Sequence, residues 1–254
     1  MIISSRRHPL IQLARALHSG KGRRENGLFL IEGRNAVAAA LESEFPLREI
    51  LAAPNEHELS ERALDLGLPV RRVESEILAY AGEAQTATSI LAFGELPVPS
   101  RGLEFPASTL VLDGISDPGN VGTLWRAADA AGMRGVASVG GADPFSPKVV
   151  RSAAGSLFHL PPLGGEDVAA LIETLSAQSV PIVTAEAHGG QNCFGFAWPA
   201  RFALVMGHET RGISPAFAAA ASARVSIPTF GRAESLNVAM AGTILMYAWA
   251  QSKV

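Results

Sequence analysis

The sequence predicts an α/β protein built from two α/β units, a small one followed by a larger one with a parallel sheet. Short apolar segments alternate with helix-like segments along the chain, which is the order typical of βαβ units. Residues 94–108 contain three prolines and two glycines without a periodic apolar face, a pattern typical of a linker. We therefore expect a domain at residues 1–95, a linker at 96–108 and a second domain at 109–254.

The first domain is predicted to begin with a helix at residues 9–19. Leu10, Leu13 and Leu17 fall on one helical face there, and Pro9 suits the first turn. The apolar segment LFLIE at 28–32 predicts a strand. Alternating elements should follow as a helix at 35–41, a strand at 48–52, a helix at 58–66 and a strand at 70–73.

The second domain opens with TLVLD at 109–113, whose continuous apolar character predicts a strand buried on both faces of a parallel sheet. Further strands are expected at 135–139, 180–185, 202–206 and 224–227. Helices are expected at 121–131, 146–154, 168–177, 215–221 and 236–251. The result is a five-stranded parallel sheet with covering helices.

Positive charge is concentrated at the start of the chain. The net charge of −3 argues against binding nucleic acid by bulk electrostatics. The first 24 residues nevertheless contain no acidic residue and six cations, namely Arg6, Arg7, Arg15, Lys21, Arg23 and Arg24. Either a local RNA-binding surface or a solvated helix face explains this segment.

Several classes of protein are disfavoured by composition and spacing. The six histidines lie far apart without cysteine or paired-carboxylate neighbours, so we expect no metal. Cys193, as the single cysteine, has no disulfide partner in the chain. The first residues lack an apolar signal segment, and the apolar stretch 236–250 is shorter than a membrane span. We expect a cytoplasmic protein without a membrane segment.

The first of three chemistry-bearing motifs is DGISDPGNVGTLWRAADAAG at 113–132, where a strand end meets a Pro-Gly turn and a helix. Open α/β folds bind ligands at such carboxyl ends of parallel strands. Asn120 could simply cap the helix. Arg126, six residues further on, is expected to project toward the loop.

The second and third motifs also follow predicted strands. In LVMGHETRGIS at 204–214, Gly207 could let the backbone approach a flat ligand, and Glu209 could accept hydrogen bonds. In VSIPTFGRAESLNVAMAGTILMYAWA at 225–250, Ser235 is a natural helix N-cap. Asn237 is expected inside the first turn of a buried helix, where its amide would need a partner.

Together the three motifs resemble the signatures of the SpoU branch of the knotted SPOUT methyltransferases, the TrmH/SpoU family, which modify ribose 2′-hydroxyls in ribosomal or transfer RNA. They occur in the family's order, and the third keeps the family's spacing from Ile227 to Asn237. The resemblance covers residues 109–250. It implies a deep trefoil knot in the C-terminal domain, S-adenosylmethionine as cofactor, and a homodimer formed by the C-terminal helices, with both subunits contributing to each site.

The resemblance also implies roles for individual residues. It implies a catalytic group of Arg126, Asn120, Glu209, Ser235 and Asn237, and cofactor contacts, largely through backbone groups, by Gly207, Ile227 and Leu236. A ribose hydroxyl is protonated at neutral pH, so the enzyme must stabilise a developing alkoxide. A guanidinium rarely releases its proton. We therefore assign Arg126 to stabilising the alkoxide and holding the adjacent phosphate, and Glu209 to orienting Arg126 or Asn120.

The N-terminal half is similar to the RNA substrate-binding domain that often precedes this catalytic domain and is related to RNA-binding ribosomal proteins. The matching segments are SSRRHPLIQLARAL and KGRRENGLFLIEGRNAV. RNA contacts are accordingly expected from Arg6, Arg7, Lys21, Arg23 and Arg24. An extra domain can hold folded RNA by shape and 2′-hydroxyl contacts, which favours ribosomal over transfer RNA.

Two alternatives come from other functional classes. A catalytically silent RNA-binding protein could keep this fold, although RNA binding alone does not require all five catalytic candidates. A generic nucleotide-binding α/β enzyme gains some support from the glycine-rich loops, but neither G-x-G-x-x-G after the first strand nor a Walker lysine motif is present. Methylation of a base also stays open, because this fold class hosts several acceptors.

Overall fold

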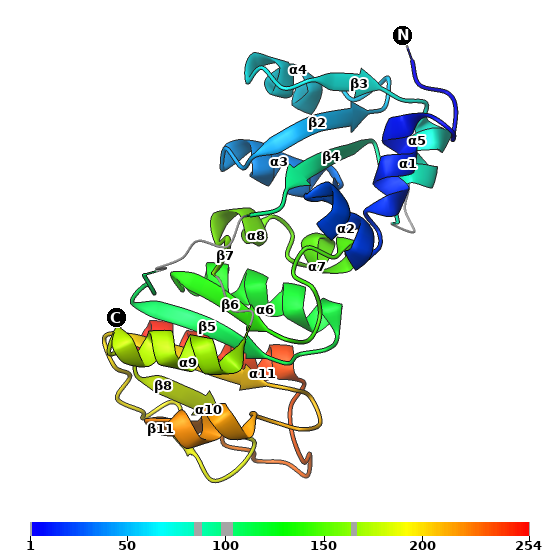
Figure 1. Cartoon of the computed structure of the whole chain (residues 1–254). Helices are drawn as coiled ribbons and strands as arrows, with labels where there is room; N and C mark the ends of the chain where they lie inside the picture. Colours follow the sequence, from blue (N-terminus) through cyan, green and yellow to red (C-terminus); the bar gives the residue numbers. More distant parts are fainter. Residues whose placement is uncertain (1, 84–87, 98–103, 164–166, 254) are drawn as a thin grey trace. The chain divides into compact units, whose positions relative to one another are not determined.

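The computed structural model describes residues 2–83, 88–97, 104–163 and 167–253, which fold into two compact units (Figure 1). One unit comprises Met1–Val98 together with Phe145–His159, and the other comprises Pro99–Pro144 and Leu160–Val254. Residues 98–103 of the predicted linker lie outside the described residues. Strand β5 starts at Ser108, one residue before the predicted second domain.

A four-stranded mixed sheet forms the centre of the first unit. Its strands are β1 (Leu28–Glu32), β2 (Leu47–Ala52), β3 (Val70–Arg72) and β4 (Ile90–Glu95). They are arranged in the order β1-β4-β2-β3, with β4 antiparallel to both neighbours and β2 parallel to β3. The sequence did not predict β4, although it is a central strand. Gly94 interrupts its pattern, and a Cβ at that position would overlap the ring of Phe29.

The helices of the first unit are α1 (Pro9–Ala16), α2 (Gly20–Asn26), α3 (Arg34–Glu42), α4 (Glu58–Asp65) and α5 (Ser75–Ala81). The helix predicted at 9–19 is too long, because Ser19 caps a second helix by accepting from the amide of Gly22 at 3.0 Å. Neither α2 nor α5 was predicted. One core cluster joins apolar residues of α1 and α5 to one face of the sheet.

A segment from later in the chain completes the opposite side of this unit. Helices α7 (Pro147–Ser152) and α8 (Ser156–His159) belong to it. The ring of Phe29 lies 4.8 Å from that of Phe145, and the ring of Phe45 lies 5.1 Å from that of Phe158. Arg151 forms an ion pair with the buried carboxylate of Glu32 at 3.3 Å. Aromatic rings at these separations pack favourably.

The second unit is built on a seven-stranded sheet in the order β7-β6-β5-β10-β8-β11-β9, in which all paired strands are parallel. The five predicted strands are β5 (Ser108–Asp113), β6 (Gly135–Val139), β8 (Ile182–Ala185), β10 (Phe202–Gly207) and β11 (Ala223–Ser226). The two unpredicted strands, β7 (Pro162–Leu163) and β9 (Gln191–Asn192), are two-residue edge strands.

Four helices cover the second sheet, namely α6 (Pro118–Ala130), α9 (Val168–Ala177), α10 (Pro215–Ala220) and α11 (Val238–Gln251). Alternate sheet residues such as Val111 and Val205 share a core cluster with α9 and α10. On the other side α11 packs against α6 (Figure 1), where a Cβ at Gly242 would overlap Leu124. Within the described residues, no helix has the length and apolar character needed to cross a membrane.

Candidate active site

The site lies where two neighbouring strands of the parallel sheet end. In the register of β5 and β10, Asp113 is opposite Gly207. The loops that leave these strands, residues 114–117 and 208–212, are therefore side by side although they lie about 90 residues apart in sequence. This is the edge of an open α/β sheet at which ligands bind.

The carboxylate of Glu209 ties the two loops together. Its Oε1 accepts from the side-chain amide of Asn120 at 3.1 Å and from the backbone amide of Asp117 at 3.3 Å. Its Oε2 accepts from the backbone amide and the hydroxyl of Ser116, both at 3.3 Å. The glutamate of the second motif is thus held by the first motif through four hydrogen bonds.

The hydrogen bonds to Glu209 favour its ionised form. Burial by itself raises the pKa of this carboxyl. Backbone hydrogen bonding at Glu209 itself, the amide of Asn120 and the backbone amides of Ser116 and Asp117 outweigh burial and lower the pKa to about 2. A carboxylate that accepts several N–H bonds is expected to behave in this way. Glu209 is therefore a fixed negative charge at neutral pH.

Asn237 extends the network to the third motif. Its Nδ2 donates to Oδ1 of Asn120 at 3.2 Å, while its Oδ1 accepts from the backbone amides of Ala239 and Met240. Asn237 is therefore the N-cap of α11. The predictions that Ser235 is this cap and that Asn237 lies inside a buried turn are wrong, because α11 begins two residues later than predicted.

The cap of α6 also differs from the sequence interpretation. Asp117 is the N-cap, and its side chain accepts from the backbone amide of Asn120 at 2.9 Å. Because the cap position is filled by Asp117, the side chain of Asn120 is free to bridge Glu209 and Asn237. The simple capping role considered for Asn120 is not the one it has.

Sequence reasoning missed two residues of this network, His208 and Ser116. The Nε2 atom of His208 lies 3.0 Å from the hydroxyl oxygen of Ser116. Its Nδ1 accepts from the backbone amide of Thr210 at 3.1 Å. No local pattern identifies this pair, because its members become neighbours only through the pairing of β5 with β10.

A cavity of about 540 Å³ opens beside the network. Its lining includes Gly207, Ile227, Ser235 and Leu236, together with Glu209 and Asn237. The three residues predicted to contact a cofactor thus line one cavity. The need for glycine at Gly207 has a different origin from the one expected, since a Cβ there would overlap the backbone of Gly212 across the turn.

The charges around this cavity are negative. Two carboxylates, Glu186 and Glu209, line it, whereas none of its described lining residues is a lysine or an arginine. Such a lining suits a cationic ligand and is unfavourable for a phosphate, which normally requires cations or free helix amides. The apolar side chains of Ile227, Leu236 and Leu245 offer surfaces for a flat ring system.

Arg126 does not join the network within the chain. It is exposed on α6, and among the residues that the structure describes no hydrogen bond or ion pair links it to Asn120, Glu209 or Asn237. Helical geometry explains this, because six residues correspond to about one and two-thirds turns, so Asn120 and Arg126 are on different faces. The expected orientation of Arg126 toward the loop is not seen in the isolated chain.

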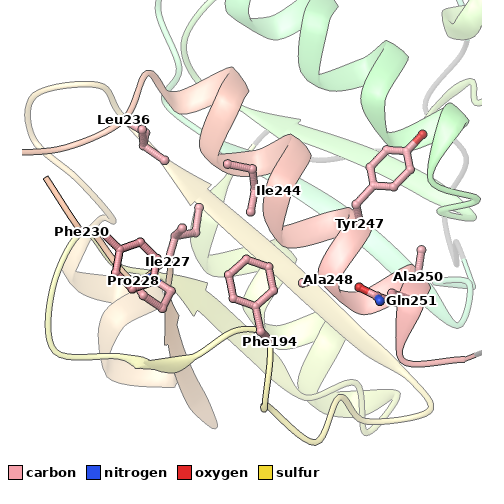
Figure 2. Close-up of a pocket in the computed structure, with 10 residues that line it drawn as sticks. All are labelled: Phe194, Ile227, Pro228, Phe230, Leu236, Ile244, Tyr247, Ala248, Ala250 and Gln251. Atoms are coloured by element: carbon pink, nitrogen blue, oxygen red, sulfur yellow. The ribbon is translucent and has the colours of Figure 1, made fainter. Parts of the chain in front are cut away.

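A second hollow lies beside the first and is apolar. Figure 2 shows its lining, which comprises Phe194, Ile227, Pro228, Phe230, Leu236, Ile244, Tyr247, Ala248, Ala250 and Gln251. We call this surface the α11 groove. Phe230 is 96% exposed and Phe194 is 60% exposed, so large apolar side chains face solvent here. A patch of this kind marks an interaction surface.

The cationic candidates of the first unit fall into two groups. Arg6, Arg7, Lys21 and Arg24 are exposed. Arg23 is 4% exposed, and its guanidinium donates to the carbonyls of Leu17 and His18 at 2.9 and 3.1 Å. The expected RNA contact by Arg23 is therefore wrong for this conformation, because the side chain is buried against the end of α1.

Comparison with known proteins agrees with this architecture over the whole chain. Residues 107–247 match the SpoU rRNA Methylase family, and residues 8–92 match the MRM3-like substrate binding domain. The chain is 32% identical to the 23S rRNA (guanosine(2553)-2′-O)-methyltransferase RlmP of Bacillus subtilis, covering 96% of this chain and 97% of that protein. It is 34% identical to the 23S rRNA (uridine(2479)-2′-O)-methyltransferase of Streptomyces viridochromogenes, covering 99% and 92%.

Two solved structures with bound cofactor are similar to this fold. One is the SpoU methyltransferase AviRb from Streptomyces viridochromogenes in complex with AdoMet, with a TM-score of 0.87 and 26% identity, covering 97% of this chain and 99% of that chain. The other is an AdoMet-bound rRNA methyltransferase from Sinorhizobium meliloti, with a TM-score of 0.87 and 28% identity, covering 100% and 98%.

Proposed function

Because this chain belongs to the SpoU rRNA methylase family, we propose that it transfers a methyl group from S-adenosylmethionine to a ribose 2′-hydroxyl of ribosomal RNA. The observation that carries the proposal is the network of Asn237, Asn120 and Glu209 at the rim of a cavity lined by carboxylates. All three family motifs meet there. Neither alternative function explains this arrangement. A protein that only binds RNA does not need such a cavity, and the negative charge of the cavity disfavours the phosphate of a nucleotide.

The cavity residues fit the proposed cofactor. S-adenosylmethionine supplies an activated methyl group on a positively charged sulfur. Ile227 and Leu236 would hold the adenine ring between apolar surfaces, and Glu186 and Glu209 would provide the negative potential that a cation requires. We therefore assign Gly207, Ile227 and Leu236 to the cofactor site.

The chain's own residues must make the acceptor hydroxyl reactive. We assign Arg126 to stabilising the developing alkoxide and holding the adjacent phosphate, because its guanidinium stays charged. Asn120, fixed between Glu209 and Asn237, would orient the acceptor with its neighbours, and Ser235 would line the entrance. Glu209 orients Asn120 in this proposal, since that hydrogen bond is the one present.

A second copy of the chain is proposed to cover the α11 groove. The exposed aromatic and aliphatic side chains of the groove would be buried by such a homodimer. The exposure of Arg126 is consistent with a site that two subunits complete. We expect Tyr247→Glu to yield monomers in sedimentation experiments, whereas Gln178→Glu, which is outside the groove, should leave the dimer intact. A stable and active wild-type monomer would contradict the proposal.

We assign residues 1–95 to RNA binding and 109–254 to catalysis, with 96–108 as the linker. The separate family matches to residues 8–92 and 107–247 support this division. The exposed cations Arg6, Arg7, Lys21 and Arg24 would contact RNA phosphates. A deep trefoil knot is also proposed for the C-terminal domain, supported by family membership and by the return of the chain after β11 to pack α11 against α6.

The decisive experiment measures transfer of labelled methyl from S-adenosylmethionine to unmodified total RNA, with Arg126→Ala beside wild type, followed by digestion to nucleosides. A labelled 2′-O-methyl nucleoside formed by wild type alone is the expected result. Label in transfer RNA, in a base or in protein would redirect the acceptor assignment. Cofactor binding with no label on any RNA would overturn the proposed reaction and favour a protein that keeps the fold for binding.

A further inference from the structure

His208 is the first residue of the turn that follows β10. The backbone of this turn is closed by two hydrogen bonds, from the amide of His208 to the carbonyl of Gly212 at 3.0 Å and from the amide of Gly212 to the carbonyl of His208 at 2.9 Å. The ring of His208 folds back over the same turn. Its Nδ1 accepts from the backbone amides of Thr210 and Arg211 at 3.1 and 3.4 Å, and lies 3.3 Å from the hydroxyl oxygen of Thr210.

These contacts decide which nitrogen of His208 carries the proton. A neutral imidazole has one donor and one acceptor nitrogen. Backbone amides can only donate, so Nδ1 must be the acceptor and the proton must be on Nε2. Nε2 then donates to the hydroxyl oxygen of Ser116 at 3.0 Å. The hydroxyl hydrogen of Ser116 is left to donate to Oε2 of Glu209 at 3.3 Å.

The direction of every hydrogen bond in this network is thereby fixed. It runs from His208 to Ser116 to Glu209, whose other oxygen accepts from Asn120. We propose that His208, as the neutral Nε2–H tautomer, is a positioning residue for methyl transfer, because it turns the Ser116 hydroxyl toward Glu209 and so fixes the carboxylate that orients Asn120. The catalytic consequence rests on the proposed function, whereas the tautomer does not.

Two amide variants separate the two nitrogens of His208. In His208→Asn the side-chain oxygen can replace Nδ1 as the acceptor for Thr210, but nothing reaches Ser116. In His208→Gln the side-chain nitrogen can replace Nε2 as the donor to Ser116. We expect kcat to fall roughly 5- to 10-fold in His208→Asn, the loss associated with one hydrogen bond, and to be substantially restored in His208→Gln. The KM for S-adenosylmethionine should change less than kcat in both variants.

A double-mutant cycle tests whether His208 acts through Ser116. Ser116→Ala should lower kcat about as much as His208→Asn, and the double variant should be little worse than either single one, because both remove the same link. His57→Asn, at an exposed position in the first unit, is the matched control and should retain wild-type kinetics. Additive losses, or equal losses in the asparagine and glutamine variants, would overturn the positioning role.

The tautomer can be measured without substrate or cofactor. Ring ¹⁵N chemical shifts of His208 at mildly alkaline pH, assigned by comparison with His208→Asn, should show a protonated Nε2 and an unprotonated Nδ1. A protonated Nδ1 or an averaged tautomer would overturn the inference even if the protein methylates RNA. The predicted tautomer in a protein without methyl-transfer activity would instead locate the failure in the proposed function.

Discussion

The side-chain amide of Asn120 donates to Oε1 of Glu209 at 3.1 Å, which joins the first turn of α6 to the turn after β10. The oxygen of the same amide accepts from Asn237 at 3.2 Å. Because one neighbour accepts and the other donates, the orientation of the Asn120 amide is determined by its surroundings. A change at Asn120 should therefore affect both contacts at once.

Asn120→Asp should lower kcat by more than Asn120→Ala. The new carboxylate would face Glu209, and repulsion between like charges would push the two loops apart. We expect a loss of at least about 30-fold, corresponding to roughly 2 kcal/mol, measured by methyl transfer at saturating cofactor. Thr123→Ala, exposed on the same helix, should be silent. Equal activity in Asn120→Asp and wild type would exclude the orienting role.

Glu209→Gln should remove part of the acid sensitivity of the protein. The pKa of Glu209 is lowered from 4.5 to about 2 in the folded protein, so its carboxylate stabilises the fold above pH 4.5. This contribution, reduced by solvent screening because the side chain is partly exposed, is lost as the pH falls from about 4.5 to about 2. Denaturant unfolding across that window should show the wild-type advantage over Glu209→Gln shrinking with acid. A difference in unfolding free energy that does not change with pH would contradict the lowered pKa of Glu209.

Arg126→Ala should abolish most methyl transfer without weakening the fold. Its side chain is exposed, so its removal costs little packing, whereas loss of a charge at a developing alkoxide costs about 100-fold or more in kcat. Thermal unfolding should coincide with wild type. Arg134→Ala, another exposed cation in the same unit, serves as the control. Unchanged kcat in Arg126→Ala would remove this residue from the mechanism, and full activity in Arg126→Lys would show that the planar guanidinium is unnecessary.

Arg23→Ala should lower stability, whereas Arg24→Ala should weaken RNA binding. Arg23 is buried and donates to two carbonyls at the end of α1, so its loss should cost about 1.5–3 kcal/mol of stability. Arg24 is exposed, so its loss should leave stability unchanged but weaken RNA binding and reduce the salt slope by about one. Denaturant unfolding and filter binding at several salt concentrations make the comparison. Loss of stability in Arg24→Ala and loss of RNA binding alone in Arg23→Ala would contradict the assignment of Arg23 to the fold and Arg24 to RNA binding.

Glu186→Gln should weaken cofactor binding by removing one of the two carboxylates of the cavity. The amide can still accept the bond that Thr184 donates to Glu186, so the loop should be preserved. We expect calorimetry to show a several-fold loss for S-adenosylmethionine and a smaller loss for S-adenosylhomocysteine, whose sulfur is uncharged. Equal losses for both molecules would indicate that the carboxylate does not respond to the sulfur charge.

The long elements could be predicted from the sequence because their patterns are continuous. The strand at 28–32, the strand at 135–139 and the helix at 168–177 have the predicted bounds. Strands of two residues carry no periodicity, so β7 and β9 could not be found. The central strand β4 was missed because Gly94 and the prolines after it resemble a linker, although the glycine makes room for Phe29.

Three members of the hydrogen-bonded network could be predicted from the sequence, whereas their contacts with one another could not. The motifs indicated Asn120, Glu209 and Asn237, and the parallel pairing of β5 with β10 brings the first two together. The roles of Ser116 and His208 depend on a contact 92 residues apart in sequence. Burial of Arg23 depends on how α2 folds back on α1. Neither contact can be predicted from the local spacing of residues in the sequence.

The placement of residues 145–159 in the first unit determines when that unit can finish folding during synthesis. Phe29 and Phe45 are synthesised early, whereas their partners Phe145 and Phe158 emerge only after β5 and β6, the first two strands of the large sheet. Domains generally fold as they leave the ribosome. In the first unit, however, the aromatic face of Phe29 and Phe45 stays exposed until residues 145–159 have been synthesised. The chain therefore couples completion of its first unit to synthesis of the second, and a fragment ending near residue 98 should expose a sticky aromatic surface.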